Sequence, residues 1–444
     1  MFAGFDYGTS NCSIALIQHG AVQLVPLEGA ETLIPSTLYA PRPQMQLERT
    51  VADIRGLDVT TRSFEELRFG RDALAAYLEA PSAGYFVKSP KSFLGAKGLS
   101  DEIKARFVGV VAAMMANVKR HADAASGEPV RQVVIGRPIN FQGAGGEDEN
   151  RNALAMLIEA ARDAGFEDVE FLYEPMAAAM EYEARLEHEE YVLVLDIGGG
   201  TTDCSFVRVG PKRRDSIERG ADILGHAGER LGGNDYDQLL ALRAFMPLLG
   251  YGDAMLSGLP IPNTYFVDAV STNDVNAQQR FFARRTLERL DRIIAEARHP
   301  QRIARLRSVQ AERLTYRIVR SAELAKVALS DAHIAAIDLD YLEQGLAGQA
   351  DRQQFAQACE RLLVHLQGLV AESVAAAGRE PDVIYLTGGM ARATIVRSYL
   401  EQKFPSARFV DSDHFASVTQ GLTLWAERLF GVDRGRVSSR PRRR

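Results

Sequence analysis

Two short segments of the chain place an aspartate, glycines and hydroxyl residues in the same order. Residues 6–10 read DYGTS, and residues 196–202 read DIGGGTT. Glycine lets the backbone come within hydrogen-bond distance of a phosphate, because a Cβ atom would intrude. The N–H groups of such turns, with hydroxyl groups beside them, form anion-binding nests. We therefore predict phosphate contacts from Gly8, Thr9, Ser10, Gly198, Gly199, Gly200, Thr201 and Thr202.

The aspartates of the two segments, Asp6 and Asp196, predict a metal ion at the same place. Each follows an apolar run, so both carboxylates lie where a strand ends. Carboxylates repel a phosphate unless a cation lies between them, and Mg²⁺ prefers carboxylates and water as ligands. A single Asp-Gly turn closes a hairpin without any ligand. Two copies with aspartate at the same offset favour a shared ligand.

The residues around each segment predict a β-hairpin, over 1–18 and again over 191–209. Strands and helices alternate after each hairpin, and this repeated beginning indicates an internal duplication. A long, mostly helical region at 234–330 lies inside the second half. In the final part we expect one helix over 351–377.

Length and composition fit a globular protein of two large lobes. The chain has 444 residues, of which 46% are hydrophobic and 25% charged. Its longest uncharged apolar stretch, 108–118, is too short to span a bilayer, so we expect a cytoplasmic protein without membrane contact. The three cysteines form no CxxC pair and are expected to be buried.

Positive charge is concentrated in one region, although the net charge is −6. Twelve arginines lie between Arg280 and Arg320. A solvated helical face with ion pairs such as Glu288 with Arg292 is the favoured interpretation, and a docking surface for a protein partner is the alternative. No nucleic-acid module accompanies these arginines, so we expect no specific nucleic-acid partner.

Other nucleotide-binding motifs do not occur in the sequence. It contains no GxxxxGK[ST] and no GxGxxG after the first strand. We therefore expect neither a Walker-type phosphate loop nor dinucleotide binding.

The order of the motifs resembles that of the actin and sugar-kinase superfamily. Within it, the chain is similar to the nucleotide-binding domain of the DnaK-type heat-shock chaperones, with the bacterial YegD-like branch as the nearest match. The segments that carry the resemblance are FDYGTSNCSIA, PKSFLG, YEPMAAAMEY, LDIGGGTTDCS, LGGNDYD, SAELAKVALS and YLTGGMAR.

This resemblance implies ATP hydrolysis with Mg²⁺. Lys91 would contact the γ-phosphate region, and Glu174 and Asp203 would help to orient the attacking water or the metal shell. Asp196 and Thr201 complete the implied catalytic set. Further contacts with ATP or ADP are implied for Asn11, Gly232, Gly233, Glu323, Lys326, Ser330, Gly388, Gly389 and Arg392.

The resemblance also implies an α/β, actin-like ATPase fold. Two lobes would each contain a duplicated ribonuclease-H-like core plus inserted subdomains, with a cleft between the lobes. Lobe I is expected at 1–188 with an insertion at about 37–125, and lobe II at 189–412 with a mostly helical insertion at about 233–345. A closing helix at 413–430 would return to lobe I, before a basic disordered tail at 431–444.

Three residues depart from the family pattern. Val327 stands where an arginine usually stacks on adenine, Asn234 replaces an acid, and Met390 replaces a small hydroxyl residue. Few residues follow the closing helix, so we expect no peptide-gripping β-sandwich. The expected function is a chaperone-related, slowly hydrolysing ATPase switch. The alternatives are a nucleotide-dependent scaffold or actin-like filament protein with negligible turnover, and a small-molecule kinase.

Overall fold

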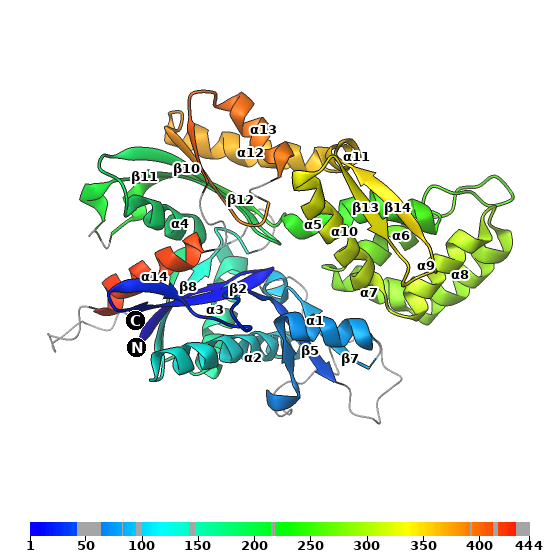
Figure 1. Cartoon of the computed structure of the whole chain (residues 1–444), viewed down its shortest axis with the longest axis horizontal. Helices are drawn as coiled ribbons and strands as arrows, with labels where there is room; N and C mark the ends of the chain where they lie inside the picture. Colours follow the sequence, from blue (N-terminus) through cyan, green and yellow to red (C-terminus); the bar gives the residue numbers. More distant parts are fainter. Residues whose placement is uncertain are drawn as a thin grey trace.

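Two β-sheets with helices packed between and around them form the body of the molecule (Figure 1). The computed structural model describes residues 1–41, 64–81, 83–94, 100–141, 147–214, 216, 218–390, 393–411 and 416–431. Except for Gly431, the tail predicted at 431–444 lies outside these residues. The mixed α/β class expected from the sequence is observed, with four sheets among the described residues.

The first sheet contains the N-terminal hairpin and has the strand order β3-β2-β1-β8-β9, with β4 paired to β2. Strands β1 and β2 are antiparallel, whereas β8 and β9 run parallel to β1. The strands span β1 Phe2–Tyr7, β2 Asn11–Gln18, β3 Ala21–Leu24, β4 Ile34–Pro35, β8 Gln132–Arg137 and β9 Asp168–Tyr173.

The second sheet repeats this arrangement with the order β12-β11-β10-β15-β16. Its hairpin strands β10 and β11 are antiparallel, and β15 and β16 run parallel to β10. The strands span β10 Glu190–Ile197, β11 Thr202–Val209, β12 Ile223–Glu229, β15 Val383–Thr387 and β16 Arg408–Asp411. The two sheets thus have the same strand order, and this repeat in the structure corresponds to the repeated hairpin in the sequence.

Two helices, α4 (Glu174–Glu183) and α14 (Ser417–Phe430), lie between the sheets and pack on each other. Every residue of α4 is buried, which explains its apolar sequence MAAAM. A Cβ atom on Gly421 would overlap the carbonyl oxygen of Ala177, so the two helices cross at close range. They form the apolar layer that joins the sheets.

Further helices cover the outer faces of both sheets (Figure 1). On the first sheet these are α2 (Asp101–Ser126) and α3 (Glu147–Asp163), and on the second they are α12 (Glu360–Ala377) and α13 (Thr394–Lys403). Helix α2 begins after Ser100, whose hydroxyl accepts a hydrogen bond from the Ile103 N–H, and it ends at Gly127 in the left-handed region.

Two smaller units extend from the sheets on the side of the hairpin turns (Figure 1). One combines a three-stranded sheet with a helix: β5 Thr37–Pro41, β6 Arg68–Phe69, β7 Gly84–Lys88 and α1 Gly70–Glu79. The other is mostly helical: α5 Gly233–Leu240, α6 Thr264–Val270, α7 Val275–Phe282, α8 Arg284–Glu296, α9 Pro300–Ala311, α10 Thr315–Asp331, β13 Ile334–Asp338, β14 Ala347–Asp351 and α11 Arg352–Ala358.

The prediction of one continuous helix in the final part of the chain is wrong. The helix expected over 351–377 is two helices, α11 and α12, separated at Cys359. Asp351 caps α11 by accepting a hydrogen bond from the Gln354 N–H, and the Cys359 side chain is fully buried at the break. Packing of this corner into the core therefore overrides the continuous helical pattern. No helix of the described residues is long and apolar enough to cross a membrane.

Candidate functional site

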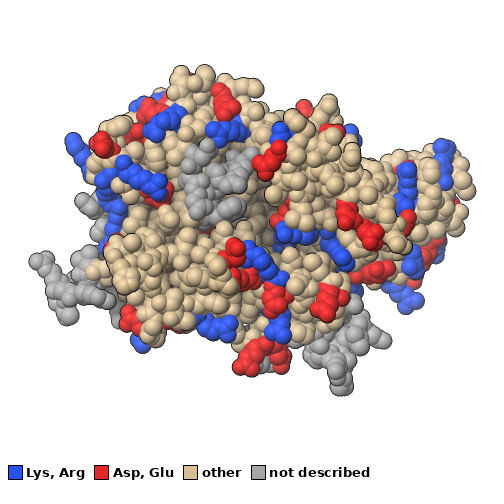
Figure 2. Space-filling model, viewed as in Figure 1, with Lys and Arg blue, Asp and Glu red and all other residues tan. Residues whose placement is uncertain are grey.

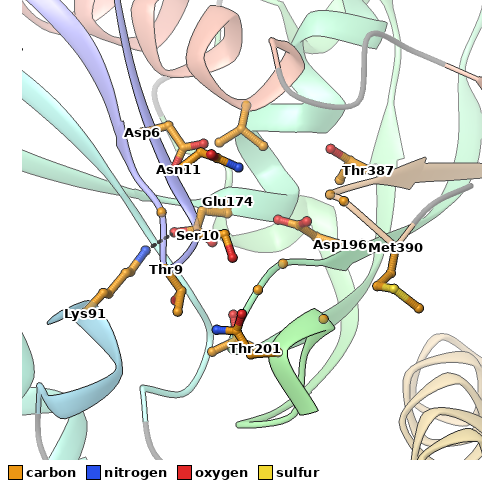
Figure 3. A pocket seen from close by; sticks show the side chains of 18 of the residues that line it. Asp6, Thr9, Ser10, Asn11, Lys91, Glu174, Asp196, Thr201, Thr387 and Met390 are labelled. Carbon is orange, nitrogen blue, oxygen red and sulfur yellow. Dashed lines mark hydrogen bonds and ion pairs between the residues drawn. The ribbon is translucent and has the colours of Figure 1, made fainter. Parts of the chain in front are cut away.

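A cleft opens between the turns of the two hairpins and encloses about 1020 Å³ of empty space that is continuous with solvent. Residues of both sheets, α4 and α10 line it. Figure 3 shows Asp6, Glu174 and Asp196 around its centre. Most of the residues singled out in the sequence line this cleft: Asp6, Gly8, Thr9, Ser10, Asn11, Lys91, Glu174, Asp196, Gly198, Gly199, Thr201, Gly233, Glu323, Lys326, Gly388 and Gly389.

The first hairpin presents its turn to the cleft between β1 and β2. Asp6 and Ser13 are paired across the two strands, so the aspartate stands near the strand end as expected. The Ser36 hydroxyl donates a hydrogen bond of 2.7 Å to the Gly8 carbonyl and fixes the turn from behind. This leaves Thr9 and Ser10 at the cleft surface.

The second hairpin faces the first directly. Asp196 and Asp203 are paired across β10 and β11, in the same positions as Asp6 and Ser13. A Cβ atom on Gly199 would overlap the Ser10 hydroxyl, and one on Gly200 would lie 2.6 Å from Thr9 Cγ2. The glycines are thus required because the two turns touch each other.

A buried ion pair joins the first small unit to α4. Lys91 Nζ donates a hydrogen bond of 2.6 Å to Glu174 Oε1, drawn as a dashed line in Figure 3. Lys91 lies in the short helix Pro90–Phe93, and Glu174 is the first residue of α4. Burial opposes the charge of Lys91, but Glu174 and Asp6 together raise its pKa, so the ammonium group stays charged.

The aspartates around this pair hold their protons more tightly than usual. Burial, followed by the charge of Glu174, raises the pKa of Asp6 to about 7. The same causes raise the pKa of Asp203 to about 7 and that of Asp196 well above its ordinary value. Asp203 Oδ1 accepts a hydrogen bond of 2.7 Å from the Ile139 N–H. Its buried Oδ2 has no hydrogen-bond partner among the described residues.

These residues fit a magnesium ion that is held mainly through water and phosphate. The buried carboxylates of Asp6, Glu174 and Asp196 line one volume, and burial, followed by the charge of Glu174, raises the pKa of both aspartates. Within the described part of the chain, no three acidic, histidine or cysteine side chains come together closely enough to hold a metal alone. Mg²⁺ usually keeps several waters and uses one or two carboxylates plus substrate phosphates. Asp6 and Asp196 are suited to that arrangement.

The opposite wall of the cleft is formed by α10, α5 and the turn after β15. Lys326 Nζ lies 2.8 Å from Asp237 Oδ1 and donates to the Gly233 carbonyl at 3.2 Å. Glu323 pairs with Lys88 at 3.5 Å and with Arg320 at 2.8 Å. Burial alone would raise the pKa of Glu323, but these cations lower it to about 2. This wall is therefore a network of fixed ion pairs.

Val327 lines this wall with 58% of its surface exposed, so the departure noted in the sequence faces the cleft. Arg320, which could replace the missing arginine, is engaged by Glu323. Gly388 has a φ of +82°, and a Cβ atom there would overlap the backbone of Ile197. The glycine turn is thus tightly packed beneath the cleft.

A few predicted residues lie away from the cleft. The Thr202 hydroxyl donates to the Leu231 carbonyl at 2.6 Å and is buried. Gly232 packs against the backbone of the second turn, and Asp203 is buried and is not among the residues that line the cleft. Gly200 and Ser330 line two smaller neighbouring cavities. Arg392 falls outside the described residues.

Six further residues line the cleft without having been predicted as site residues, among them Asn234 and Val327. Thr387 ends β15 next to Gly388, and Val418 belongs to the first turn of α14. Asp237 and Met390 complete this set. Thr387 could have been found, because it ends a strand directly before a glycine turn, as Asp6 and Asp196 nearly do. Asp237 and Val418 carry no comparable local pattern.

Comparison with known families gives a match over the first half of the chain. A family model described as "Hsp70 protein" matches residues 2–245, which is more than half of the chain. The matched part contains both hairpins, Lys91 and Glu174.

Curated relatives extend the similarity along the chain. Chaperone protein HscA of Yersinia enterocolitica is 26% identical over 439 residues, or 97% of this chain and 58% of that protein. Chaperone protein HscA of Salmonella typhimurium is 25% identical over the same shares. A Chaperone protein HscA homolog of Paracidovorax citrulli is 30% identical over 240 residues, 54% of this chain and 36% of that protein. The chain spans little more than half the length of the Yersinia and Salmonella proteins.

Proposed function

The chain belongs to the Hsp70 family, and on this premise we propose that it is a switch that binds Mg-ATP and hydrolyses it slowly. The predicted resemblance to the heat-shock chaperones is confirmed at this level, and the YegD-like branch stays a prediction. The observation that carries the proposal is the Lys91–Glu174 pair, buried where both glycine turns and the aspartates converge.

In the proposed reaction, the two turns hold the phosphates with their N–H groups and with the hydroxyls of Thr9 and Thr201. Magnesium, when bound, would neutralise phosphate charge, with Asp6 and Asp196 holding its waters. Water forms a bond to the γ-phosphorus, and the bond from that phosphorus to the bridging oxygen of ADP breaks. Lys91 stabilises the charge that develops on the phosphoryl oxygens.

Glu174 and Asp203 are the proposed orienting groups for the attacking water. A carboxylate with a pKa near the working pH is suited to hold or receive the proton that the water loses. The pKa of Asp203, raised to about 7 by burial, meets this condition. Its Oδ2, which has no hydrogen-bond partner among the described residues, also leaves one acceptor for that water.

The nucleoside is proposed to lie along α10 and the glycine turn, near Glu323, Lys326, Ser330, Gly388 and Gly389. Arg392 stays a predicted member of this set. Because Val327 provides no cation for stacking on adenine, base recognition would rest on shape and on the polar groups nearby. We therefore propose that the protein binds ATP. It should discriminate less strictly between bases than between ligands with and without the phosphates.

The output of the switch is proposed to be a change in the packing of the two sheets around α4 and α14. The protein partner predicted at the Arg-rich helices stays a prediction. Arg302, Arg305 and Arg307 are paired there with Asp253, Glu343 and Asp291. On the face drawn in Figure 2, basic and acidic side chains are interspersed over this end of the molecule.

The proposal is tested by calorimetric titration of ATP and ADP, with and without Mg²⁺, beside a phosphate-release assay. We expect Mg²⁺-dependent binding followed by slow release. Failure of both nucleotides to bind would make the hairpins purely structural and favour the scaffold alternative. Filament formation is checked by sedimentation with ATP, and kinase activity by ATP consumption that depends on an added metabolite.

A further inference from the structure

A side cavity adjoins the main cleft where α10, α11 and the start of α13 meet. It contains about 420 Å³ of empty space, part of which is open to solvent. Lys326, Val327, Gly389 and Met390 line both the main cleft and this side cavity. Figure 3 shows Met390 on the opposite side of the pocket from Lys91. The side cavity therefore lies at the end of the cleft that is farther from the proposed phosphate site.

The walls of the side cavity are mostly apolar. Leu329 of α10, Phe355 of α11 and Ile395 of α13 contribute to three of them. The hydroxyl residues Ser330 and Thr394 add polar groups, and no carboxylate residue lines the cavity among the described residues. A space of this kind is suited to a flat ring with a polar edge.

Arg352 is the first residue of α11, and its side chain extends to the end of α10. Its Nε donates a hydrogen bond to the Leu329 carbonyl, and its Nη2 donates to the Ser330 carbonyl, both at 2.7 Å. These two bonds hold the guanidinium group in one plane. Arg352 lines the side cavity, and it forms no ion pair with an acidic side chain in the part of the chain that the structure describes.

The two hydrogen bonds of Arg352 also have a structural effect. The carbonyls of Leu329 and Ser330 lie in the last turn of α10, where they have no partner within the helix. An arginine that binds them stabilises the helix end. This effect needs only the N–H groups at the edge of the guanidinium group. Because the bonds lie in its plane, its flat faces stay available to a ring.

The other cations at this end of the cleft are engaged by acidic residues. Lys326 is paired with Asp237 at 2.8 Å, and Arg320 is paired with Glu323 at 2.8 Å. Val327 stands where the family pattern has an arginine. Arg352 is therefore the remaining cation that could contact the base of a bound nucleotide.

We infer that the base of the nucleotide enters the side cavity and stacks on the guanidinium group of Arg352, which replaces the arginine missing at position 327. The inference rests on the proposed function, because it concerns the base of the same nucleotide. A planar cation attracts the face of an aromatic ring. Stacking uses the face of the base and not its edge, so it agrees with the weak discrimination between bases proposed above.

The test compares ADP with ribose 5-diphosphate, two ligands that differ only in the base, by calorimetric titration with Mg²⁺. Arg352→Gln keeps an N–H donor for the α10 carbonyls but removes the planar cation. It should weaken ADP binding about tenfold and leave ribose 5-diphosphate binding unchanged. The matched control, Arg361→Gln, makes the same change at an exposed position of α12 and should alter neither affinity.

A second variant tests the replacement directly. Val327 is 58% exposed, so an arginine has room at this position. In the Arg352→Gln protein, Val327→Arg should restore most of the lost ADP affinity without changing ribose 5-diphosphate binding. Thermal unfolding is measured for each variant. If Arg352→Gln does not fold, Arg352→Lys keeps the charge and a donor but not the flat face, and its loss of affinity should also be confined to ADP.

The outcomes separate this inference from the proposed function. Equal ADP affinity in Arg352→Gln and Arg361→Gln would show that Arg352 does not touch the base. An equal loss for both ligands would leave Arg352 only as the cap of α10. Wild-type protein that binds ribose 5-diphosphate as tightly as ADP would have no base site. Each of these results overturns the inference while phosphate binding stands. If the wild type binds neither Mg-ADP nor Mg-ATP, the proposed function itself fails.

Discussion

Lys91 and Glu174 form an ion pair of 2.6 Å, with only 5% and 9% of their side chains exposed. Lys91 comes from a short helix after β7, and Glu174 begins α4, which packs against both sheets. The pair therefore connects a small unit of the first half to the layer between the sheets, at the place where phosphate is proposed to react.

Lys91→Ala should lower the rate of ATP hydrolysis by about a hundredfold to a thousandfold, the usual cost of removing one group that stabilises transition-state charge. Affinity for Mg-ATP should fall only modestly, because the two turns still hold the phosphates. Single-turnover hydrolysis and calorimetric titration measure the two effects separately. A Lys104→Ala variant, which removes an exposed ion pair with Asp101, should change neither.

Lys91→Ala also leaves Glu174 buried without its partner, so stability must be measured beside activity. Lys91→Arg keeps the charge and serves as the second variant. Hydrolysis at the wild-type rate in a folded Lys91→Ala protein would remove Lys91 from the proposed site.

Asp203→Asn should make the nucleotide-free protein more stable, and the gain should depend on pH. The pKa of Asp203 rises from 3.8 to about 7 on folding because the carboxyl is buried, and because Glu174 lies near. The native state thus binds more protons than the unfolded state between pH 3.8 and about 7. Wild-type stability falls as pH rises through this window, while asparagine does not titrate.

The difference between the Asp203→Asn and wild-type unfolding midpoints should therefore grow towards pH 7 and level off above it. Thermal unfolding in a pH series measures it. Asp163→Asn, at an exposed position near the end of α3, is the control. A stability gain that is equal at low and high pH would show that the raised pKa is not its cause.

The hairpins were predictable because the information is local. Apolar runs, a glycine turn and an aspartate at the strand end determine each hairpin, and their repetition indicated that both serve one ligand. Thr202 is a residue whose side-chain direction the local pattern did not predict. It begins β11, where side chains alternate between the two faces. Thr201 consequently lines the cleft, whereas Thr202 turns to the Leu231 carbonyl.

Other features depended on long-range packing. Asp237 enters the cleft wall through its contact with Lys326, which is distant in sequence. The helix break at Cys359 has no proline or glycine, while Gly368 lies within the unbroken α12. Neither position carries a signal in its own neighbourhood, because the partner that decides the outcome lies elsewhere in the chain.

Tyr7→Phe should leave the free energy of unfolding unchanged or raise it by about 1 kcal/mol, because an unpaired buried hydroxyl is costly. Tyr7 is fully buried beside the first turn, and its hydroxyl has no hydrogen-bond partner within the described part of the chain. Denaturant unfolding measures the change. Tyr182→Phe is the matched comparison, since the Tyr182 hydroxyl donates to Glu190 at 2.6 Å and its loss should destabilise the protein. Equal losses in the two variants would contradict the assignment.

Gly421→Ala should destabilise the protein by about 3 kcal/mol, the upper range for forcing an extra methyl group into a packed contact. A Cβ atom at this position in α14 would overlap the carbonyl oxygen of Ala177 in α4, and backbone on both sides leaves little room to adjust. Gly368→Ala offers the opposite case at an exposed position of α12. No atom lies within 4 Å of its added Cβ, so the higher helix propensity of alanine should stabilise by about 1 kcal/mol.

The two variants make the same chemical change and differ only in what the methyl group meets. Denaturant unfolding should therefore move their midpoints in opposite directions. Because α14 and α4 lie between the two sheets, Gly421→Ala should also weaken Mg-ATP binding, whereas Gly368→Ala should not. A Gly421→Ala protein with wild-type stability would show that the close crossing of α14 and α4 is not needed to join the sheets.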